Sequence, residues 1–147
     1  MCGVVGLMSP DIGALSDCVQ RMSAAVQHRG PDDHGVWLDE AVGVGLGHRR
    51  LSIVDLSPAG HQPMVSADGR WVIALNGEIY DHREHRARLE SRGVQFRGHS
   101  DTEVLLELIA LVGIEDALAA VDGMFALGLW DRRDRVLVLA RDRVGEK

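Results

Sequence analysis

The sequence predicts an α+β fold in which largely antiparallel sheets pack in layers with helices. Three observations indicate this class. Short apolar runs of strand length occur near both ends and in the middle of the chain, helical patterns are grouped between them instead of alternating regularly with strands, and short turns separate neighbouring strands. The 147 residues fit one domain, which at this length can bury a substantial core.

The first elements are a strand and a helix. The apolar run from Val4 to Leu7 predicts a buried strand with Cys2 at its end. Ser9-Pro10 then offers a helix start, and apolar residues recur at three- and four-residue steps between Ile12 and Val26. An amphipathic helix is therefore expected, ending before Gly30.

The next segment favours strands and turns. The runs 35–38 and 41–46 are expected to form a hairpin around an acidic turn at Asp39-Glu40. A loop follows at 55–62, where proline and glycine interrupt any regular pattern. A further buried strand is expected from Trp71 to Leu75, ending at Asn76-Gly77.

The remaining elements are three helices and two strands. The polar stretch 81–92 predicts an exposed helix that stops at Gly93, and Ser100–Glu103 matches a capping box at the start of the next helix. A short helix at 114–121 follows, and strands at 124–130 and 136–141 complete the expected fold.

Composition excludes several classes of function. Sixteen basic and 22 acidic residues give a formal charge of -6, which argues against a nucleic-acid partner. A membrane span is not expected, because no run of about eighteen apolar residues occurs. The start of the chain lacks the pattern of a secretory signal, so we expect a cytoplasmic protein.

Metal and dinucleotide sites are not expected. Two cysteines form neither a disulfide framework nor a metal cluster, and the histidines lack the H-E-x-x-H spacing of a zinc site. Gly43, Gly45 and Gly47 form G-x-G-x-G, whereas a dinucleotide-binding turn needs G-x-G-x-x-G before a helix.

Cys2 is the strongest candidate for catalysis. If Met1 is removed, the thiol and a free α-amine belong to one residue, and such an amine titrates closer to neutral pH than a lysine. It could then accept the thiol proton without another base. The alternative is a buried cysteine that acts as a small hydrophobic residue.

A nucleophile that attacks a carbonyl also needs donors for the oxyanion. Asn76-Gly77 could supply a side-chain N–H and a closely approaching backbone N–H. The alternative is a plain turn, because Asn-Gly is also a strong hairpin signal.

Charged residues nearby could bind the two ends of an amino acid. Arg49 or Arg50, at the end of a strand, could hold a carboxylate, and Asp101 and Glu78 could hold an ammonium group. The alternatives are a surface arginine pair and an ordinary acidic residue in the first turn of a helix.

Several long motifs resemble one family in order and over essentially the whole chain. They are Met1-Cys2-Gly3, HRGPDDHG at 28–35, GHRRLSIVDLSPAGHQPM at 47–64, NGEIYDH at 76–82, SDTEVLL at 100–106 and DGMFALGLWD at 122–131. Together they resemble the glutaminase domain of glutamine-hydrolysing asparagine synthetases, which are class II glutamine amidotransferases. The resemblance implies the four-layer αββα sandwich of N-terminal nucleophile hydrolases, with residues 1–147 as the glutaminase domain.

The resemblance also implies roles for individual residues. Cys2 would attack the side-chain amide of L-glutamine, and Asn76 and Gly77 would form the oxyanion hole. The substrate-binding residues implied by the motifs are Arg50, Leu51, Ser52, Ile53, Val54, Asn76, Gly77, Glu78 and Asp101. No cofactor is implied for this chain.

The family's second half is not part of this sequence. Family members continue into a synthetase domain that uses ATP and magnesium and receives the ammonia, so a synthetase domain or subunit is the implied partner, and a homodimer is a further possibility. Two alternatives stay open: a related amidotransferase with a different ammonia acceptor, and a non-catalytic structural domain of an amide-forming synthetase.

Overall fold

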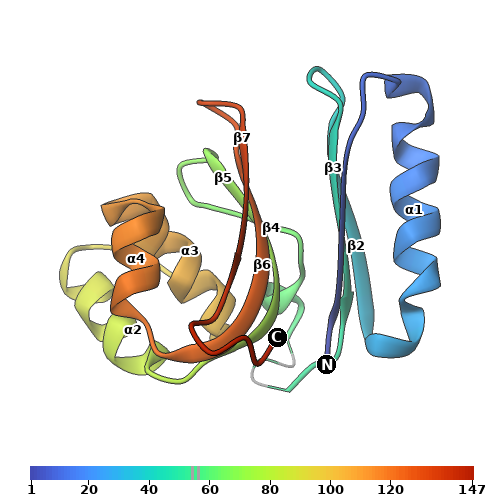
Figure 1. Cartoon of the computed structure of the whole chain (residues 1–147). Helices are drawn as coiled ribbons and strands as arrows, with labels where there is room; N and C mark the ends of the chain where they lie inside the picture. The colour runs from blue at the N-terminus through green and yellow to red at the C-terminus, as the bar shows by residue number, and fades with distance from the viewer. Residues whose placement is uncertain (54, 56) are drawn as a thin grey trace.

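Two antiparallel sheets pack face to face, and helices cover both outer faces (Figure 1). This arrangement, in a computed structural model that describes residues 1–53, 55 and 57–147, confirms the expected α+β αββα sandwich. Both chain ends lie at the same end of the sandwich, close to the start of the first strand (Figure 1).

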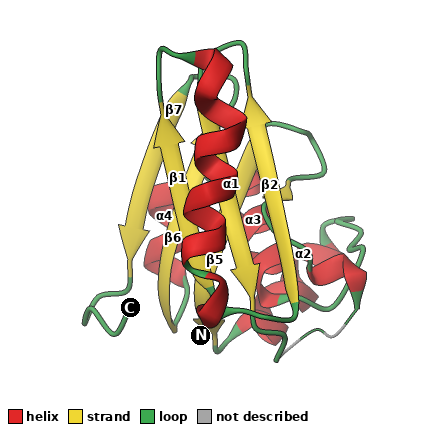
Figure 2. Cartoon of the chain, turned by 90° about the vertical axis from the view of Figure 1, so that its right-hand side faces the viewer, coloured by secondary structure: helices red, strands yellow, loops and turns green. Residues whose placement is uncertain are grey.

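The smaller sheet, called sheet A here, carries one helix on its outer face. Its strands are β1 (Gly3–Met8), β2 (Asp33–Asp39) and β3 (Val44–Arg50), in the order β1-β3-β2. Helix α1 (Leu15–Ala25) runs along this sheet between short 3-10 turns η1 (Ile12–Ala14) and η2 (Gln27–Arg29) (Figure 2).

The larger sheet, sheet B, carries the other helices. Its strands are β4 (Met64–Val65), β5 (Trp71–Ile79), β6 (Gly123–Asp131) and β7 (Val136–Arg141), in the order β4-β5-β6-β7. Its outer face is covered by α2 (His82–Ser91), α3 (Asp101–Val112) and α4 (Ile114–Ala120) (Figure 1). A 3-10 turn, η3 (Pro58–Gly60), lies in the connection from β3 to β4.

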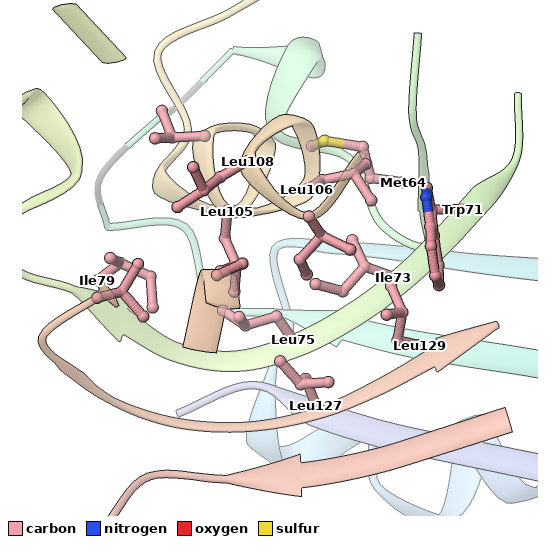
Figure 3. Close-up of a cluster of buried hydrophobic side chains, with 14 of the residues drawn as sticks. Met64, Trp71, Ile73, Leu75, Ile79, Leu105, Leu106, Leu108, Leu127 and Leu129 are labelled. Carbon is pink, nitrogen blue, oxygen red and sulfur yellow. The ribbon is translucent and has the colours of Figure 1, made fainter. Parts of the chain in front are cut away.

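Two apolar clusters hold these layers together. The larger one lies between sheet B and its helices, where Leu105 and Leu106 of α3 meet Ile73, Leu75 and residues of β6 (Figure 3). The smaller one fills the space between the sheets and is formed by Val44, Leu46, Val72 and Trp130. Helix α3 is buried from Asp101 to Ile109, and this packing fixes the position of its own first residue, Asp101.

The glycines of β3 allow α1 to approach the sheet closely. A Cβ on Gly45 would lie 2.6 Å from a methyl group of Val19, and one on Gly47 would lie 3.3 Å from the other methyl group of the same residue. These glycines therefore serve helix packing.

The predicted hairpin was wrong in its second strand. Residues 41–43 form the turn itself, and β3 begins at Val44 and continues to Arg50. Gly43 has a φ of 72°, which ends the strand pattern, and its carbonyl accepts a hydrogen bond from Ser9 N–H at 2.8 Å. The turn is thus fixed by a contact with the segment after β1.

Two other local signals had a different outcome in the structure. Asn76-Gly77 is not a turn, because β5 continues through both residues and pairs with β6 as far as Ile79. Ser100 caps α3 by accepting from Thr102 N–H at 3.1 Å, but the carboxylate of Glu103 bonds to the N–H groups of Arg97 and Gly98 instead of closing a capping box.

Candidate functional site

One cavity of about 110 Å³ opens beside the start of β1, between the two sheets. Most of its walls come from four segments: the first residues of the chain, the loop after β3, the second half of β5 and the start of α3; Met124 of β6 and Lys147 complete the lining. It is lined by Met1, Cys2, Arg50, Leu51, Ile53, Asp55, Gly60, Gln62, Leu75, Asn76, Gly77, Glu78, Ser100, Asp101, Thr102, Met124 and Lys147. Its size suits a small metabolite, since sites for drug-sized ligands occupy roughly 300–1,000 Å³.

Cys2 is placed in this cavity by the pairing of β1 with β3. Gly3 lies opposite Arg49, so the residue before β1 lies beside the residues that follow β3. The Cys2 Sγ accepts from Leu51 N–H at 3.4 Å and lies 3.8 Å from the Leu51 carbonyl oxygen. A backbone donor therefore points at the sulfur, where it would stabilise a thiolate.

The edge of β5 presents backbone N–H groups toward the cavity. Leu75 N–H donates to Gln62 Oε1 at 2.7 Å and Ile79 N–H donates to Asp101 Oδ2 at 2.9 Å, so alternate residues of β5 turn their N–H groups to this edge. Gly77 lies between them in this alternation and lines the cavity.

The strand on the other side of β5 does not take the Gly77 N–H. The residue opposite Gly77 is Phe125, whose N–H donates to the Asp142 carboxylate and whose carbonyl accepts from Asp142 N–H. Among the described residues, the Gly77 N–H thus has no backbone acceptor, and it is free to donate into the cavity. A Cβ at this position would collide with the Met124 carbonyl, which explains why glycine is required.

Arg50 places a buried guanidinium group at one end of the cavity. The side chain is 8% exposed; its Nη1 donates to the Ser57 carbonyl at 3.1 Å and its Nη2 donates to the Asp55 carbonyl. A guanidinium group has five N–H donors, so these two bonds leave others for a ligand. Gly60 packs against the guanidinium group, and a larger residue there would displace it.

Asp55 links this end of the cavity to the start of α3. Its carboxylate accepts from the N–H groups of Ser57 and His99, both at 2.8 Å. Burial would raise the pKa of Asp55, but these hydrogen bonds hold that pKa below its ordinary value. The ionised carboxylate therefore ties the loop after β3 to the segment that leads into Asp101.

Asp101 contributes a buried carboxylate to the lining of the same cavity. It is 5% exposed, and it accepts from Ile79 N–H and from Thr102 N–H, both at 2.9 Å. Burial raises the pKa of Asp101 above its ordinary value, and the nearby Glu78 charge acts in the same direction. A cationic group of a ligand would offset this cost of ionising a buried carboxylate.

The last residues of the chain form a further wall. The Asp142 carboxylate accepts from Val144 N–H at 3.1 Å and Glu146 N–H at 2.9 Å, and it also bonds to Lys147 N–H. These backbone bonds lower the pKa of Asp142 to about 2, so the carboxylate stays ionised and holds the segment folded. Lys147 is thereby brought to the cavity beside Met1.

The structure brings most of the predicted site residues together. Those that line the cavity are Cys2, Arg50, Leu51, Ile53, Asn76, Gly77, Glu78 and Asp101. Ser52 is not among the lining residues; its N–H donates to Asp32 Oδ2 at 2.8 Å, and Val54 lies outside the described residues. Arg49 points to the other face of sheet A and donates to Ser23 of α1, so Arg50 is the arginine of the site.

Several lining residues were not predicted from the sequence. Gln62, Thr102 and Met124 reach the cavity through tertiary packing, although all three lie in motifs that resemble the family: GHQPM, SDTEVLL and DGMFALGLWD. No cluster of three or more histidine, cysteine or acidic side chains suited to a metal ion occurs within residues 1–53, 55 and 57–147. Across the same residues, every helix is too short or too polar to span a bilayer.

Comparisons with known proteins agree with this geometry. A family model described as a glutamine amidotransferase domain matches residues 1–147. Asparagine synthetase [glutamine-hydrolyzing] 1 of Bacillus subtilis is 41% identical over 100% of this chain, and Amidase chry2 of Gibberella zeae is 42% identical over 83% of it. The chain spans 23% of the length of the first protein and 18% of the second.

A solved structure supports the fold. The glutamine phosphoribosylpyrophosphate amidotransferase of B. subtilis, complexed with ADP and GMP, superposes with a TM-score of 0.70 over 98% of this chain and 37% of its own. The two sequences are 21% identical, so this likeness concerns the fold. The match of the family model over the whole chain, with a thiol and a free backbone donor in one cavity, shows that the chain belongs to the glutamine amidotransferase domain family.

Proposed function

We propose that this chain hydrolyses L-glutamine to glutamate and ammonia through a thioester on Cys2, without a cofactor of its own. The observation that carries the proposal is the single cavity that joins Cys2, the free Gly77 N–H, the Arg50 guanidinium and the Asp101 carboxylate. Together with the Cys2 α-amine as a base, a nucleophile, an oxyanion donor and binding groups for both charged ends of an amino acid are the groups that this reaction needs.

The first step forms the thioester. The Cys2 sulfur attacks the side-chain carbonyl carbon of glutamine, and the thiol proton moves to the α-amine of Cys2, which is free once Met1 is removed. The carbonyl oxygen becomes an oxyanion that accepts from the Gly77 N–H and the Asn76 side chain. When the carbon–nitrogen bond breaks, the Cys2 ammonium returns its proton to the leaving nitrogen, and ammonia departs.

The second step releases glutamate. Water attacks the γ-glutamyl thioester while the Cys2 α-amine takes one of its protons. The carbon–sulfur bond then breaks, and the ammonium group protonates the departing thiolate. Glutamate leaves and the starting state is restored.

The charged ends of the cavity would select a free amino acid. Arg50 would pair with the α-carboxylate of glutamine, and Asp101 with Glu78 would hold its α-ammonium group, while Leu51 and Ile53 contact the rest of the molecule. We also assign Ser52 and Val54 to this loop contact, as the motif resemblance implies.

Substrate analogues test this assignment on Met1-free protein. Analogues of glutamine that lack the α-carboxylate or the α-amine should lose about 10- to 100-fold in kcat/KM, because each removes a charged hydrogen bond of roughly 1.5–3 kcal/mol. Glutamate and ammonia release are measured for each. Equal turnover of glutamine and of both analogues would refute the proposed function. It would also be refuted if glutamine gave no glutamate although a thiol reagent showed that the Cys2 thiol was reduced and accessible.

Asp101→Asn is expected to raise KM for glutamine about 10- to 100-fold with a smaller effect on kcat, because the substrate ammonium loses its charged partner. In the unchanged protein, KM should rise as the pH falls through the Asp101 pKa, which burial raises above that of an ordinary aspartate. In Asp101→Asn, KM should not depend on pH in this way. Glutamate release between about pH 4.5 and 8 measures both effects.

The same variant has a predicted effect on stability. Because the folded-state pKa of Asp101 is raised, its ionisation destabilises the substrate-free protein as the pH rises through that pKa. Asp101→Asn should remove this slope in thermal unfolding, whereas Asp17→Asn, an exposed change on α1, should alter neither the slope nor KM. An unchanged KM in Asp101→Asn at pH 7 would contradict the role of this carboxylate.

We propose further that the ammonia serves ATP-dependent synthesis of asparagine from aspartate, in the cytoplasm, by a synthetase domain or subunit that uses ATP and magnesium. The 41% sequence identity with an asparagine synthetase over 100% of this chain supports this acceptor, as do the motifs DLSPAG at 55–60 and SDTEVLL at 100–106. A homodimer belongs to the same proposal.

A different acceptor is the second candidate, because an amidase is as similar in sequence as the asparagine synthetase is. An assay of the chain together with its proposed synthetase domain or subunit distinguishes the two. Supplied with glutamine, aspartate and ATP-magnesium, this combination should form asparagine in proportion to glutamate; glutamate without asparagine would favour another acceptor.

A further inference from the structure

His48 is a buried histidine that the proposed reaction does not use. It lies on β3 two residues before Arg50, so both side chains point to the same face of sheet A, toward β5. Its side chain is 1% exposed, and His48 is not among the residues that line the cavity.

Within the described part of the chain, the ring of His48 makes one hydrogen bond, and that bond fixes its tautomer. Nε2 lies 3.0 Å from the Leu75 carbonyl oxygen, which can only accept, so Nε2 carries the hydrogen and Nδ1 does not. Nδ1 is buried without a partner among the described residues. Burial is the main reason that the pKa of His48 falls to about 4; the bond to Leu75 opposes this fall and the charge of Arg50 adds to it. The ring is therefore a neutral donor at physiological pH.

The acceptor of this bond lies directly before the oxyanion donors. Strand β4 pairs with β5 only at Val72 and Ile73, so it does not reach Leu75. Two side chains take its place: His48 donates to the Leu75 carbonyl, and Gln62 accepts from the Leu75 N–H at 2.7 Å. Gln62 in turn donates to Thr102 Oγ1 at 3.2 Å, next to Asp101.

The same bond connects the two halves of the site. Arg50 belongs to sheet A and Cys2 directly precedes its strand β1, whereas Asn76 and Gly77 belong to sheet B. In the described part of the chain, two side-chain hydrogen bonds join strands of the two sheets. One is His48 to Leu75 at the cavity, and the other is Trp130 Nε1 to Asp39 at 3.4 Å, at the far end of β2.

We propose that His48 is a positioning residue that sets the distance between the Cys2 sulfur and the oxyanion donors of β5 by holding the Leu75 carbonyl. It does not touch the substrate and exchanges no proton. This inference rests on the proposed glutaminase function, and it assigns a role in the reaction to a residue that does not line the cavity. Since a misplacement of about 1 Å can cost about 100-fold in rate, one buried bond at this place has a large effect.

Two variants of similar length separate positioning from simple core packing. His48→Gln keeps a donor at about the reach of Nε2, whereas His48→Met fills a similar volume without a donor. We expect His48→Met to lower kcat and kcat/KM for glutamine by about 10- to 100-fold with KM within about threefold of the original, because the lost interaction acts on the transition state. His48→Gln should recover most of this loss.

A second measurement reports on the oxyanion hole alone. The γ-aldehyde analogue of glutamate adds the Cys2 sulfur to its carbonyl carbon, and the thiol proton ends on the new hydroxyl oxygen, which lies where the oxyanion forms. Its affinity should fall in His48→Met by about the same factor as kcat/KM, while inhibition by glutamate, which forms no such bond, should be unchanged. Alkylation of Cys2 by iodoacetamide should also proceed at the original rate.

Several outcomes would overturn the proposal. The first is a kcat/KM in His48→Met equal to that of the unchanged protein. The second is an equal loss of affinity for the aldehyde and for glutamate in His48→Met. The third is an activity of His48→Gln no higher than that of His48→Met. If His48→Met does not fold, His48→Asn, whose donor ends short of Leu75, replaces it with the same expectations. A lack of glutaminase activity in the unchanged, Met1-free protein would instead count against the proposed function itself.

Discussion

Replacing Cys2 by alanine is expected to abolish glutamate release from glutamine, with a loss of about 10⁴-fold or more. The thioester route has no other nucleophile, because Cys2 is the one cysteine that lines the cavity formed by the described residues. The oxyanion donors and the charged ends of the cavity would stay in place, so glutamine should still bind. Steady-state release of glutamate and ammonia, with glutamine affinity measured by calorimetry, tests both parts.

The fold should survive this substitution. The sulfur is only partly buried, and its hydrogen bonds are two weak contacts with the backbone of Leu51. Cys18→Ala is the matched control, since that thiol lies on α1, outside the cavity lining, and its loss should leave turnover unchanged. Undiminished turnover in Cys2→Ala, or an equal loss in Cys18→Ala, would eliminate Cys2 as the nucleophile.

Elements with a strong local signal were predictable from the sequence. The three- and four-residue apolar period predicted α1, and Ser100 predicted the start of α3, because helix periodicity and N-caps depend on neighbouring residues. The second strand of the hairpin was misplaced because Gly45 and Gly47 weaken its strand pattern. Glycine is needed at these two positions because Val19 of α1 packs closely against them, and no local sequence pattern encodes this tertiary contact.

The site was only partly predictable for the same reason. Asn76-Gly77 carries a turn signal, and only its pairing with β6 places it inside a strand. Side-chain alternation along β3 could have assigned Arg50 to the inner face and Arg49 to the helix face, had the bounds of the strand been known. His48 gives no local signal, because its role depends on a backbone carbonyl 27 residues away.

Retention of Met1 is the second change with a large expected effect. The residue lines the same cavity as Cys2 and is 58% exposed, and its sulfur lies 2.9 Å from the Lys147 ammonium nitrogen. A retained methionine would turn the Cys2 α-amine into a peptide nitrogen that cannot accept a proton near neutral pH, and it would also occupy one wall of the cavity. We therefore expect Met1-bearing protein to have less than about 1% of the activity of the Met1-free form, since general-base catalysis contributes about 10²–10⁴-fold.

Mass spectrometry and glutamate release measured on the same samples test this expectation. Activity should rise in proportion to the Met1-free fraction and extrapolate to nearly zero. A variant with lysine inserted between Met1 and Cys2 resists trimming, because methionine is removed before small residues, and it should be inactive. Full activity in homogeneous Met1-bearing protein would contradict the assignment of the α-amine as the base.

The two effects of Met1 can be separated chemically. Acetylating the α-amine of Met1-free protein removes the base but adds far less bulk to the cavity than a methionine does. If loss of the base is the main effect, the acetylated form should be as inactive as the Met1-bearing form while it still binds the product glutamate. If acetylated protein instead keeps most of its activity, the cavity and not the amine is the reason that Met1 must leave, and another group must accept the Cys2 proton.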